Sequence, residues 1–463
     1  SYYGLYNPYI LLSYLFPFIK MINYLITINC LIVIISTILF YYFLRKHQHN
    51  EKISFITSFL FLVSGPLIFH AKRHIMFINY FPFLILGLFS IDYFYEKKKS
   101  TPLILSIILI ILSSYYFSIP SLIVLFLYYI YKYVKEENKI TIKKLICKSI
   151  KLIPPFLIGI LITSILLLPT AYTLLTGRST STKNISLFNL FTPSISKSLL
   201  YSPYSIGLTL ISLISLVYFA LRGKKEKKYL SITCLLITIF PIFNYILNGT
   251  LYINAKSLIP FIPLILILVA NFLEIFLKKI NLKKQYFIIT YLIISSFIIC
   301  LYTNSNDKLM KKSDIDNKEY QTINQLIHEI ANEDQDFYRI NTNLNEEKYI
   351  NKIDNISTRK TTIYSSTSNQ NYINTYNNLL NNPIPNRNKF MISPSPNPFS
   401  QIILGEKYII TKQKLTLGYK LIKTKNEINL YENTNSLPLG YATNHTISLD
   451  DFKKLTYPNN TIQ

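Results

Sequence analysis

The chain has 463 residues, half of them hydrophobic, and its mean hydropathy is positive. This composition excludes an ordinary soluble protein, in which apolar and charged residues balance differently. The net charge of +25 raises the question of nucleic acid, but the basic residues of the N-terminal two thirds form short clusters between apolar runs. Such clusters indicate membrane topology rather than a phosphate-binding face. We therefore expect a membrane protein that contacts the lipid bilayer and binds no nucleic acid.

Ten apolar runs are candidates for membrane-spanning helices, each of which needs about 20 residues. In chain order they cover residues 22–44, 53–69, 75–95, 102–117, 119–133, 150–168, 204–221, 229–247, 257–277 and 286–302. The fourth and fifth runs could instead form one long bent helix. Lysine and arginine gather in every second loop, at residues 45–52, 96–101, 134–149, 222–228 and 278–285. This alternation favours a polytopic α-helical protein with ten spans, and it places these loops in the cytoplasm.

A second domain is predicted over residues 304–463, after a transmembrane domain over residues 1–303. Its composition changes to Asn, Lys, Asp and Ser, and apolar residues no longer run together. A helix is expected over residues 320–334, with Ile323, Leu326, Ile327 and Ile330 on one face. Short β-like runs lie at residues 337–340, 407–410, 419–422 and 428–431, another helix is expected over 372–380, and Pro383 to Pro398 is expected as an extended loop. These features predict a small α+β domain, which the topology places outside the cytoplasm.

Acidic residues are scarce in the predicted transmembrane domain, although glycosyl and phosphoryl transfer usually need a carboxylate as base or metal ligand. They are Glu51, Asp92, Glu96, Glu136, Glu137, Glu226 and Glu274, and the predicted topology places all of them on the cytoplasmic side. The cysteines, at positions 30, 147, 234 and 300, show no paired spacing, so neither a disulfide framework nor a zinc site is expected. No cofactor is assigned with certainty, and a divalent metal ion is left open.

Prolines in the apolar runs lie mainly toward the predicted outer ends of the helices. They are Pro66, Pro82, Pro120, Pro169, Pro241, Pro260 and Pro263. Because broken helices are tolerated where they line a covered or watery cavity, this pattern favours an outward-facing cavity. The alternative is that the prolines only cap or kink helices near the interface.

Cations in the predicted outer loops run against the positive-inside rule and are candidate ligands of an anion. The predicted phosphate-binding residues are His70, Lys72, Arg73, His74 and Lys256, and the predicted substrate-loop residues are Arg178 and Asn254. A lipid-linked phosphate or pyrophosphate suits such cations at a membrane surface. The alternative is that they extend to lipid headgroups as interfacial anchors. Metal binding by the two histidines is not expected without a nearby carboxylate.

Short motifs follow one another along most of the chain. They are Tyr6-Asn7-Pro8-Tyr9, Leu15-Phe16-Pro17, Ser64-Gly65-Pro66, His74-Ile75-Met76-Phe77, Tyr80-Phe81-Pro82-Phe83, Ser114-Tyr115-Tyr116-Phe117, Leu247-Asn248-Gly249, the run from Lys256 to Pro263, Phe337-Tyr338-Arg339-Ile340, Tyr364-Ser365-Ser366, Lys407-Tyr408-Ile409 and Tyr431-Glu432-Asn433. In this order, with membrane helices first and the outer domain last, the sequence resembles the YfhO family of bacterial membrane proteins. That family is similar to GT-C type glycosyltransferases acting outside the cell.

The resemblance implies a GT-C-like fold in the bacterial cell membrane. It also implies transfer of a sugar from a polyprenyl-phosphate donor onto a cell-surface polymer such as teichoic acid. Enzymes of this class place a catalytic Asp or Glu in the first outer loop. Residues 1–20 resemble the end of that loop but contain no acid, so the catalytic acid is expected upstream of Ser1. The alternatives are a non-catalytic transporter or flippase of a lipid-linked sugar and a scaffold for cell-envelope assembly.

Overall fold

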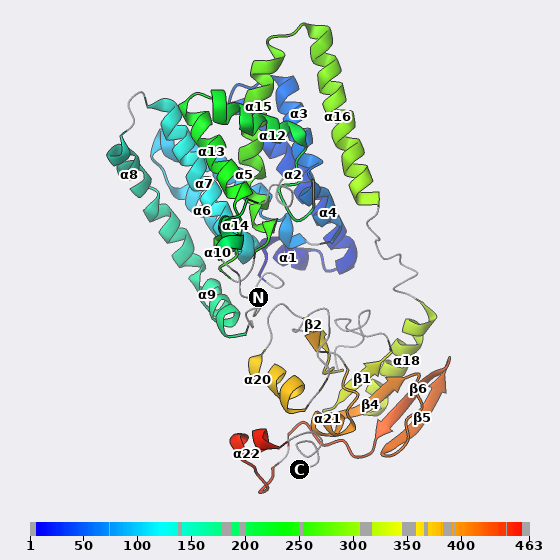
Figure 1. Ribbon diagram of the computed structural model, residues 1–463. Helices are drawn as coiled ribbons and strands as arrows, with labels where there is room; N and C mark the ends of the chain where they lie inside the picture. Colours follow the sequence, from blue (N-terminus) through cyan, green and yellow to red (C-terminus); the bar gives the residue numbers. More distant parts are fainter. Residues whose placement is uncertain are drawn as a thin grey trace. The chain divides into compact units, whose positions relative to one another are not determined.

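The computed structural model describes residues 6–73, 75–137, 141–177, 187–193, 201–250, 253–305, 317–344, 358–364, 369–380, 382, 391–392, 394–440 and 442–455. The chain divides into two compact units. The helical unit comprises residues 1–170 and 180–308, and the C-terminal unit comprises residues 171–179 and 309–463. Figure 1 shows the first as a bundle of helices and the second as a small mixed structure containing the strands.

The helices of the first 305 residues follow the apolar runs of the sequence. Their bounds are α1 (Pro8–Leu11), η1 (Leu12–Leu15), α2 (Met21–Lys46), α3 (Glu51–Leu62), α4 (Gly65–Arg73), η2 (Ile75–Phe77), α5 (Phe81–Lys97), α6 (Thr101–Ser113), α7 (Tyr115–Glu136), α8 (Ile142–Ile150), α9 (Ile153–Gly177), α10 (Leu187–Phe191), α12 (Leu210–Arg222), α13 (Lys225–Ile239), α14 (Pro241–Leu247), η3 (Ala255–Phe261), α15 (Ile262–Leu277) and α16 (Leu282–Ser305). Proline occupies the first turn of α5, α6, α14 and α15, where its missing N–H costs no helical hydrogen bond.

Nine of the ten apolar runs lie in a helix or in a pair of consecutive helices, whereas the first six residues of run 204–221 precede α12. The number of membrane crossings stays a prediction. In the described part of the chain, 6 helices are long and apolar enough to cross a membrane, or up to 8 if each bent pair is one span. The pairs are α3–α4, bent by 47°, and α13–α14, bent by 83°. Helices α6 and α12 have 13 residues each, or about 20 Å, which is shorter than a hydrocarbon core of about 30 Å.

The fourth and fifth apolar runs form two separate helices, α6 and α7. The break between them lies at Ser114, whose backbone is extended and whose side chain caps α7 by accepting a hydrogen bond from Phe117 N at 3.4 Å. The apolar runs 102–117 and 119–133 predict this break at Ser118 instead. Pro120 lies within the first turns of α7, so the helix begins before this proline rather than after it.

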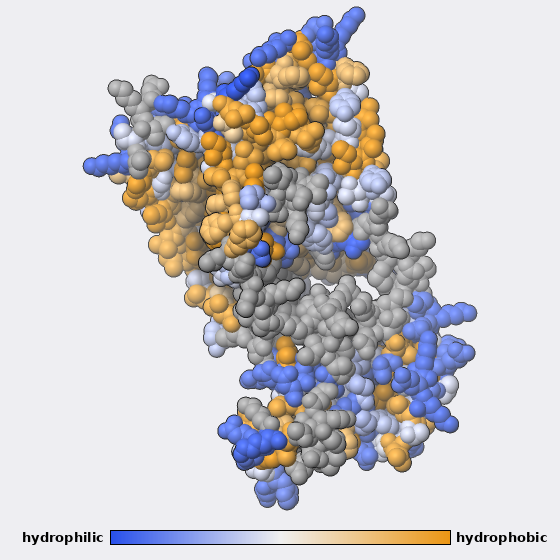
Figure 2. Space-filling view, in the orientation of Figure 1, coloured by the Kyte–Doolittle hydropathy of each residue, from blue (hydrophilic) through white to orange (hydrophobic). Residues whose placement is uncertain are grey.

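Helix α15 lies within the helical unit, while α9 and α16 lie at its margins (Figure 1). Nearly every side chain of α15 from Ile262 to Ala270 is buried. By contrast, α16 exposes a series of large apolar side chains, among them Phe287, Tyr291, Ile294 and Leu301. Figure 2 shows that hydrophobic residues cover much of the surface of this unit. Such a surface suits lipid as the surrounding solvent.

The C-terminal unit contains a helix packed on a four-stranded sheet. Its elements are α18 (Lys318–Glu333), β1 (Arg339–Asn343), β2 (Ile363–Tyr364), α20 (Gln370–Ile373), the π-helical turn η4 (Asn374–Leu379), β3 (Met391–Ile392), α21 (Pro398–Ile403), β4 (Glu406–Thr411), β5 (Tyr419–Lys425), β6 (Ile428–Asn433) and α22 (Leu449–Lys454). The sheet order is β1-β4-β6-β5, with β1 and β4 parallel and the other pairs antiparallel, and β2 pairs with β3 separately.

The predicted apolar face of residues 320–334 is confirmed, since Ile323, Leu326, Ile327 and Ile330 are all buried in one core. This core also contains side chains of the sheet, including Ile340 and Ile410. The predicted α+β character of this part of the chain is therefore confirmed. Of the predicted proline-rich loop, residues 383–390 and 393 lie outside the described residues.

Candidate functional site

The predicted cations Lys72 and Arg73 lie at the end of a short broken helix, α4. Helix α3 ends at Leu62, and α4 begins at Gly65 after the 47° bend. Gly65 N donates a hydrogen bond of 2.9 Å to Gly207 O. A Cβ atom on Gly65 would lie 2.8 Å from Ser202 O, so only glycine allows segment 201–207 to approach so closely. This contact fixes where α4 starts.

His70 holds the other part of α4 against the same segment. Its side chain is fully buried, and its Nε2 atom lies 2.9 Å from Pro203 O. The imidazole stacks on Phe77 with ring centroids 4.0 Å apart and meets Tyr204 edge-on at 5.2 Å. His70 therefore lies inside the unit, on a different face of α4 from Ile68 and Lys72, which are four residues apart.

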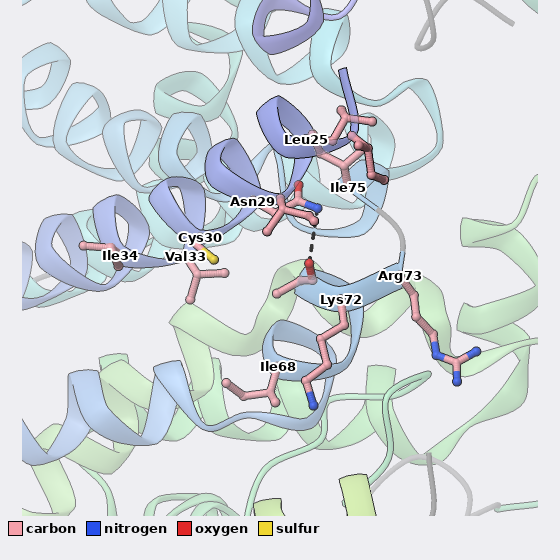
Figure 3. Close-up of a pocket in the computed structure, with 12 residues that line it drawn as sticks. Leu25, Asn29, Cys30, Val33, Ile34, Ile68, Lys72, Arg73 and Ile75 are labelled. Carbon is pink, nitrogen blue, oxygen red and sulfur yellow. Dashed lines mark hydrogen bonds between the residues drawn. The ribbon is translucent and has the colours of Figure 1, made fainter. Parts of the chain in front are cut away.

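A groove of about 660 Å³ lies between α2 and α4 (Figure 3). Its walls are Ile22, Leu25, Ile26, Asn29, Cys30, Val33 and Ile34 from α2, and Ile68, Ala71, Lys72, Arg73 and Ile75 from α4 and η2. Apart from the two cations and one amide, the lining side chains are apolar or the thiol of Cys30. Figure 3 shows the two cationic side chains extending from the last turn of α4.

Asn29 is the polar group of the α2 wall and is not among the residues predicted from the sequence. Its Nδ2 atom donates to Ala71 O at 3.2 Å, which ties α2 to α4 (Figure 3). Its Oδ1 atom is buried and has no hydrogen-bond partner among the described residues. A buried amide oxygen of this kind costs free energy unless a donor reaches it. The sequence signal for this residue is an asparagine inside a run long enough to span a membrane.

Lys256 and Asn254 lie together in another part of the helical unit. Asn254 accepts a hydrogen bond from Lys256 N at 3.0 Å, so this predicted substrate-loop residue caps η3. Lys256 Nζ lies 4.7 Å from the centre of the Tyr116 ring. Tyr116 OH donates to Asn248 Oδ1, and Asn248 Nδ2 donates to Asn254 O at 2.9 Å. These contacts fix the backbone around Lys256.

A continuous series of aromatic contacts runs from His70 to Lys256. Phe77, stacked on His70, meets Phe117 at 5.1 Å, and Phe117 meets Tyr116 at 4.7 Å, on which Lys256 lies. Lys72 and Arg73 both border the groove, with the Arg73 guanidinium 5.0 Å from the centre of the Phe69 ring. His70 and Lys256 lie at the two ends of this aromatic cluster. The other predicted residues, His74 and Arg178, lie outside the described residues.

The opposite end of the helical unit holds a buried carboxylate among cations. Asp92 of α5 is fully buried and accepts hydrogen bonds from Tyr128 OH and Lys132 Nζ, both at 2.9 Å. His47 Nε2 lies 3.0 Å and Lys46 Nζ 3.5 Å from the same carboxylate. These residues come from α7 and from the end of α2, so Asp92 ties three helix ends together. The sequence placed acids at this end but did not reveal this burial.

A side-chain hydrogen bond at this end joins His49 to α15, with its Nδ1 atom 2.9 Å from Glu274 Oε2. Glu51 lies there too, 3.6 Å from Arg45. Within the described residues, no group of three or more His, Cys, Asp or Glu side chains could hold a metal ion. Lys72 and Arg73, which border the α2–α4 groove, are cations of the kind that form charge-assisted hydrogen bonds with phosphate.

Comparison with known proteins supports the family suggested by the motifs. A family model described as bacterial membrane protein YfhO matches residues 1–243 and 204–463, which together cover the whole chain. Neither the curated proteins nor the solved structures give a match to the chain. The predicted resemblance is confirmed, and with it the placement of this protein in a bacterial membrane, in contact with lipid. The chain belongs to the YfhO family of bacterial membrane proteins.

Proposed function

We propose that this YfhO family protein is a membrane glycosyltransferase. Its donor is a sugar linked to polyprenyl phosphate, and its acceptor is a cell-surface polymer such as teichoic acid on the outer face of the membrane. One observation carries the proposal: two adjacent cations, Lys72 and Arg73, line an otherwise apolar groove of about 660 Å³ between α2 and α4. A polyprenyl phosphate has the matching chemistry, since it joins a long apolar chain to an anionic head.

The groove supplies two interactions that such a donor needs. The isoprenoid chain packs on the isoleucine and leucine side chains of α2, many of which are exposed at this face, including Ile22 and Ile26. The phosphate accepts charge-assisted hydrogen bonds from Lys72 and Arg73. The buried Asn29 Oδ1 accepts a hydrogen bond from a hydroxyl group of the lipid-linked sugar. His70 acts as a positioning residue, because it fixes the face of α4 that carries the two cations.

In the proposed reaction the acceptor hydroxyl oxygen attacks the anomeric carbon of the sugar. The bond between this carbon and the phosphate oxygen breaks, and polyprenyl phosphate leaves with the electron pair. Lys72 and Arg73 stabilise the charge on this leaving group. The hydroxyl proton passes to a base. The acids of residues 1–305 lie at the Asp92 end, so this proposal takes a carboxylate base from outside those residues.

The same proposal includes an orientation of the chain across the membrane. The basic loops surround the Asp92 end of the helical unit, and the positive-inside rule assigns that end to the cytoplasm. The groove end is then extracytoplasmic. Residues 1–303 form the transmembrane domain, in a GT-C-like arrangement, and residues 304–463 form an extracytoplasmic domain.

The test combines donor binding and sugar transfer with the full chain in lipid nanodiscs. Native mass spectrometry measures the affinity for a polyprenyl monophosphate, and a cell-based assay measures glycosylation of the surface polymer. Removing two charge-assisted contacts in Lys72→Ala/Arg73→Ala should weaken binding at least tenfold, since each is worth about 1.5–3 kcal/mol, and should abolish glycosylation.

The matched control is Lys283→Ala/Lys284→Ala, which removes two exposed lysines from the start of α16. This variant has lost the same net charge, so it should bind the polyprenyl monophosphate as the wild type does. Unchanged affinity and unchanged glycosylation in the Lys72→Ala/Arg73→Ala variant would refute the assignment of the groove.

A flippase of a lipid-linked sugar is the second candidate, and the two bent helix pairs favour it. Helices α3–α4 and α13–α14 break at Gly65-Pro66 and at Pro241, and transporters often place their substrate sites at interrupted helices. Vesicles that contain the protein and a fluorescent lipid-linked sugar separate the two functions. A flippase moves the lipid between leaflets and leaves the sugar attached, whereas a glycosyltransferase releases polyprenyl phosphate only when an acceptor is present.

A further inference from the structure

The C-terminal unit contains a pocket of about 540 Å³ at the point where the parallel strands β1 and β4 begin. Its lining residues are Asp336, Phe337, Tyr338, Gly405, Lys407 and the segment from Ser436 to Gly440. A volume in this range is typical of small-molecule sites, which combine an apolar surface with a few fixed polar groups. The residues of this pocket have that mixed character: two aromatic side chains, two charged groups and a loop containing leucines.

An exposed aromatic ring forms one wall of the pocket. Phe337 has 60% of its surface exposed, although Phe is usually buried in a folded domain. The guanidinium of Arg359 lies 3.7 Å from its ring centre. This stacking restricts the Phe337 side chain before a ligand binds. The side chain therefore loses less conformational entropy on binding.

The lysine that lines the pocket is paired with two carboxylates. Lys407 Nζ lies 2.6 Å from Asp334 and 3.3 Å from Asp336. Tyr408 OH donates to Asp334 at 2.7 Å, which fixes that carboxylate. Asp336 is 79% exposed and keeps hydrogen-bonding capacity for a ligand. Because the positive charge of Lys407 is matched by two carboxylates, this pocket does not suit a phosphate and suits a neutral ligand with several hydroxyl groups.

The opposite wall is held close by a glycine. Gly405 has φ +66°, and a Cβ atom there would lie 2.7 Å from Leu439 Cδ2. Leu437 N donates to Ile402 O at 3.0 Å, which fixes the 436–440 segment beside β4. The pocket is thus formed by backbone contacts that exist without a ligand, as in a preformed site.

A peptide strand does not fit as well as a compact ligand. The pocket lies at the strand starts, and next to it Ile340 of β1 already forms a parallel bridge with Lys360. This bridge occupies the sheet edge to which an extended peptide would otherwise add.

We propose that the pocket binds a saccharide, with the C–H face of one sugar ring on Phe337 and its hydroxyl groups on Asp336 and Lys407. This proposal does not depend on the transfer reaction in the helical unit.

The absence of tryptophan from the chain provides a direct test. Phe337→Trp in the full chain keeps an aromatic platform and introduces a single tryptophan at the pocket. The probes are maltohexaose and chitohexaose, titrated against the protein in nanodiscs. We expect a saturable change in tryptophan emission with at least one oligomer at millimolar concentration, because a sugar on the indole changes its solvent exposure. The control is Phe399→Trp, since Phe399 is also exposed at 47% but does not line the pocket.

Saturation-transfer NMR with the wild-type chain provides a second measurement that needs no tryptophan. Magnetisation should pass to the oligomer that binds. Phe337→Ala should remove the transfer, whereas Phe399→Ala, at an exposed ring outside the pocket, should retain it. Three results would overturn the proposal. The first is no saturable change in Phe337→Trp with either oligomer, and the second is an equal change in Phe399→Trp. The third is displacement of the sugar by 10 mM inorganic phosphate, roughly tenfold above the binding range.

Discussion

The two ends of the helical unit use positive charge in different ways. At one end Lys132, Lys46 and His47 surround the fully buried carboxylate of Asp92 and tie α2, α5 and α7 together. At the other end Lys72 and Arg73 line an apolar groove, and the acids of residues 1–305 lie elsewhere. The first set of charges stabilises the fold. On our proposal, the second set binds the phosphate of a lipid-linked sugar, so mutations at the two ends should affect different properties.

Asp92→Ala should give the largest loss of stability. It removes the buried one of the two carboxylates that Lys132 contacts at 2.9 Å, and breaking a buried ion pair by removing one partner costs about 3–5 kcal/mol. Thermal unfolding in detergent measures the effect. Glu51→Ala is the control, because Glu51 is 79% exposed and lies at the same end, so its removal should change stability little. Equal unfolding temperatures for Asp92→Ala and the wild type would contradict the role given to this cluster.

A buried carboxylate in the C-terminal unit sharpens the comparison, since its hydrogen-bond donors are neutral. Glu406 accepts from Asn341 Nδ2 at 2.6 Å and from Thr361 Oγ1. Burial raises its pKa from 4.5 to about 7, against these hydrogen bonds. The folded unit therefore holds the proton more tightly than the unfolded chain. Its stability is greatest below about pH 4.5 and falls as the pH rises through 7, by up to roughly 3 kcal/mol.

Hydrogen exchange of the β4 and β6 amides at several pH values, corrected for intrinsic rates, measures this dependence in the full chain. In Glu406→Gln the amide keeps a hydrogen-bond acceptor for Asn341 and cannot ionise, so protection should become nearly independent of pH between 5 and 8, about the range of the Glu406 titration. A wild-type stability that rises across this range would contradict the assignment to Glu406.

Gly207→Ala should have a smaller effect on stability but should also impair the groove. Gly207 has φ +60°, and a Cβ atom would lie 2.4 Å from Pro66 Cδ at the start of α4. We expect a loss of about 2 kcal/mol and weaker binding of polyprenyl monophosphate, because α4 must shift. Gly249→Ala is a matched control with φ +65° and no atom within 4 Å of the added Cβ. If both variants bind the lipid equally, α4 is not positioned by this contact.

The sequence predicted the elements better than the contacts between them. Apolar runs and basic loops located the helices, and the spacing of Ile323, Leu326, Ile327 and Ile330 predicted the buried face of α18. The number of spans could not be settled in this way, because α6 and α12 are apolar but short. Local composition does not say whether a short apolar helix crosses the membrane or packs within protein.

The site shows the same limit at the level of single residues. Lys72 and Arg73 were singled out because they are adjacent cations in a predicted outer loop, and the structure places both in the groove. His70 belongs to the same loop, yet its ring faces Pro203, more than a hundred residues away. Asn29 reaches the groove from α2. Which face a helix presents depends on distant segments that pack on it, and single-sequence patterns do not contain those contacts.

The most direct test of the ligand role of the groove uses two native cysteines. Cys30 lines the groove and is exposed, whereas Cys147 is exposed on α8 and does not line it. Alkylation by N-ethylmaleimide, followed by mass spectrometry of each cysteine peptide, compares the two sites within one molecule in nanodiscs. We predict that polyprenyl monophosphate slows alkylation of Cys30 several-fold in the wild type, but not in Lys72→Ala/Arg73→Ala, and leaves Cys147 unchanged. If the lipid leaves Cys30 unprotected, or slows both cysteines equally, the groove is not its binding site.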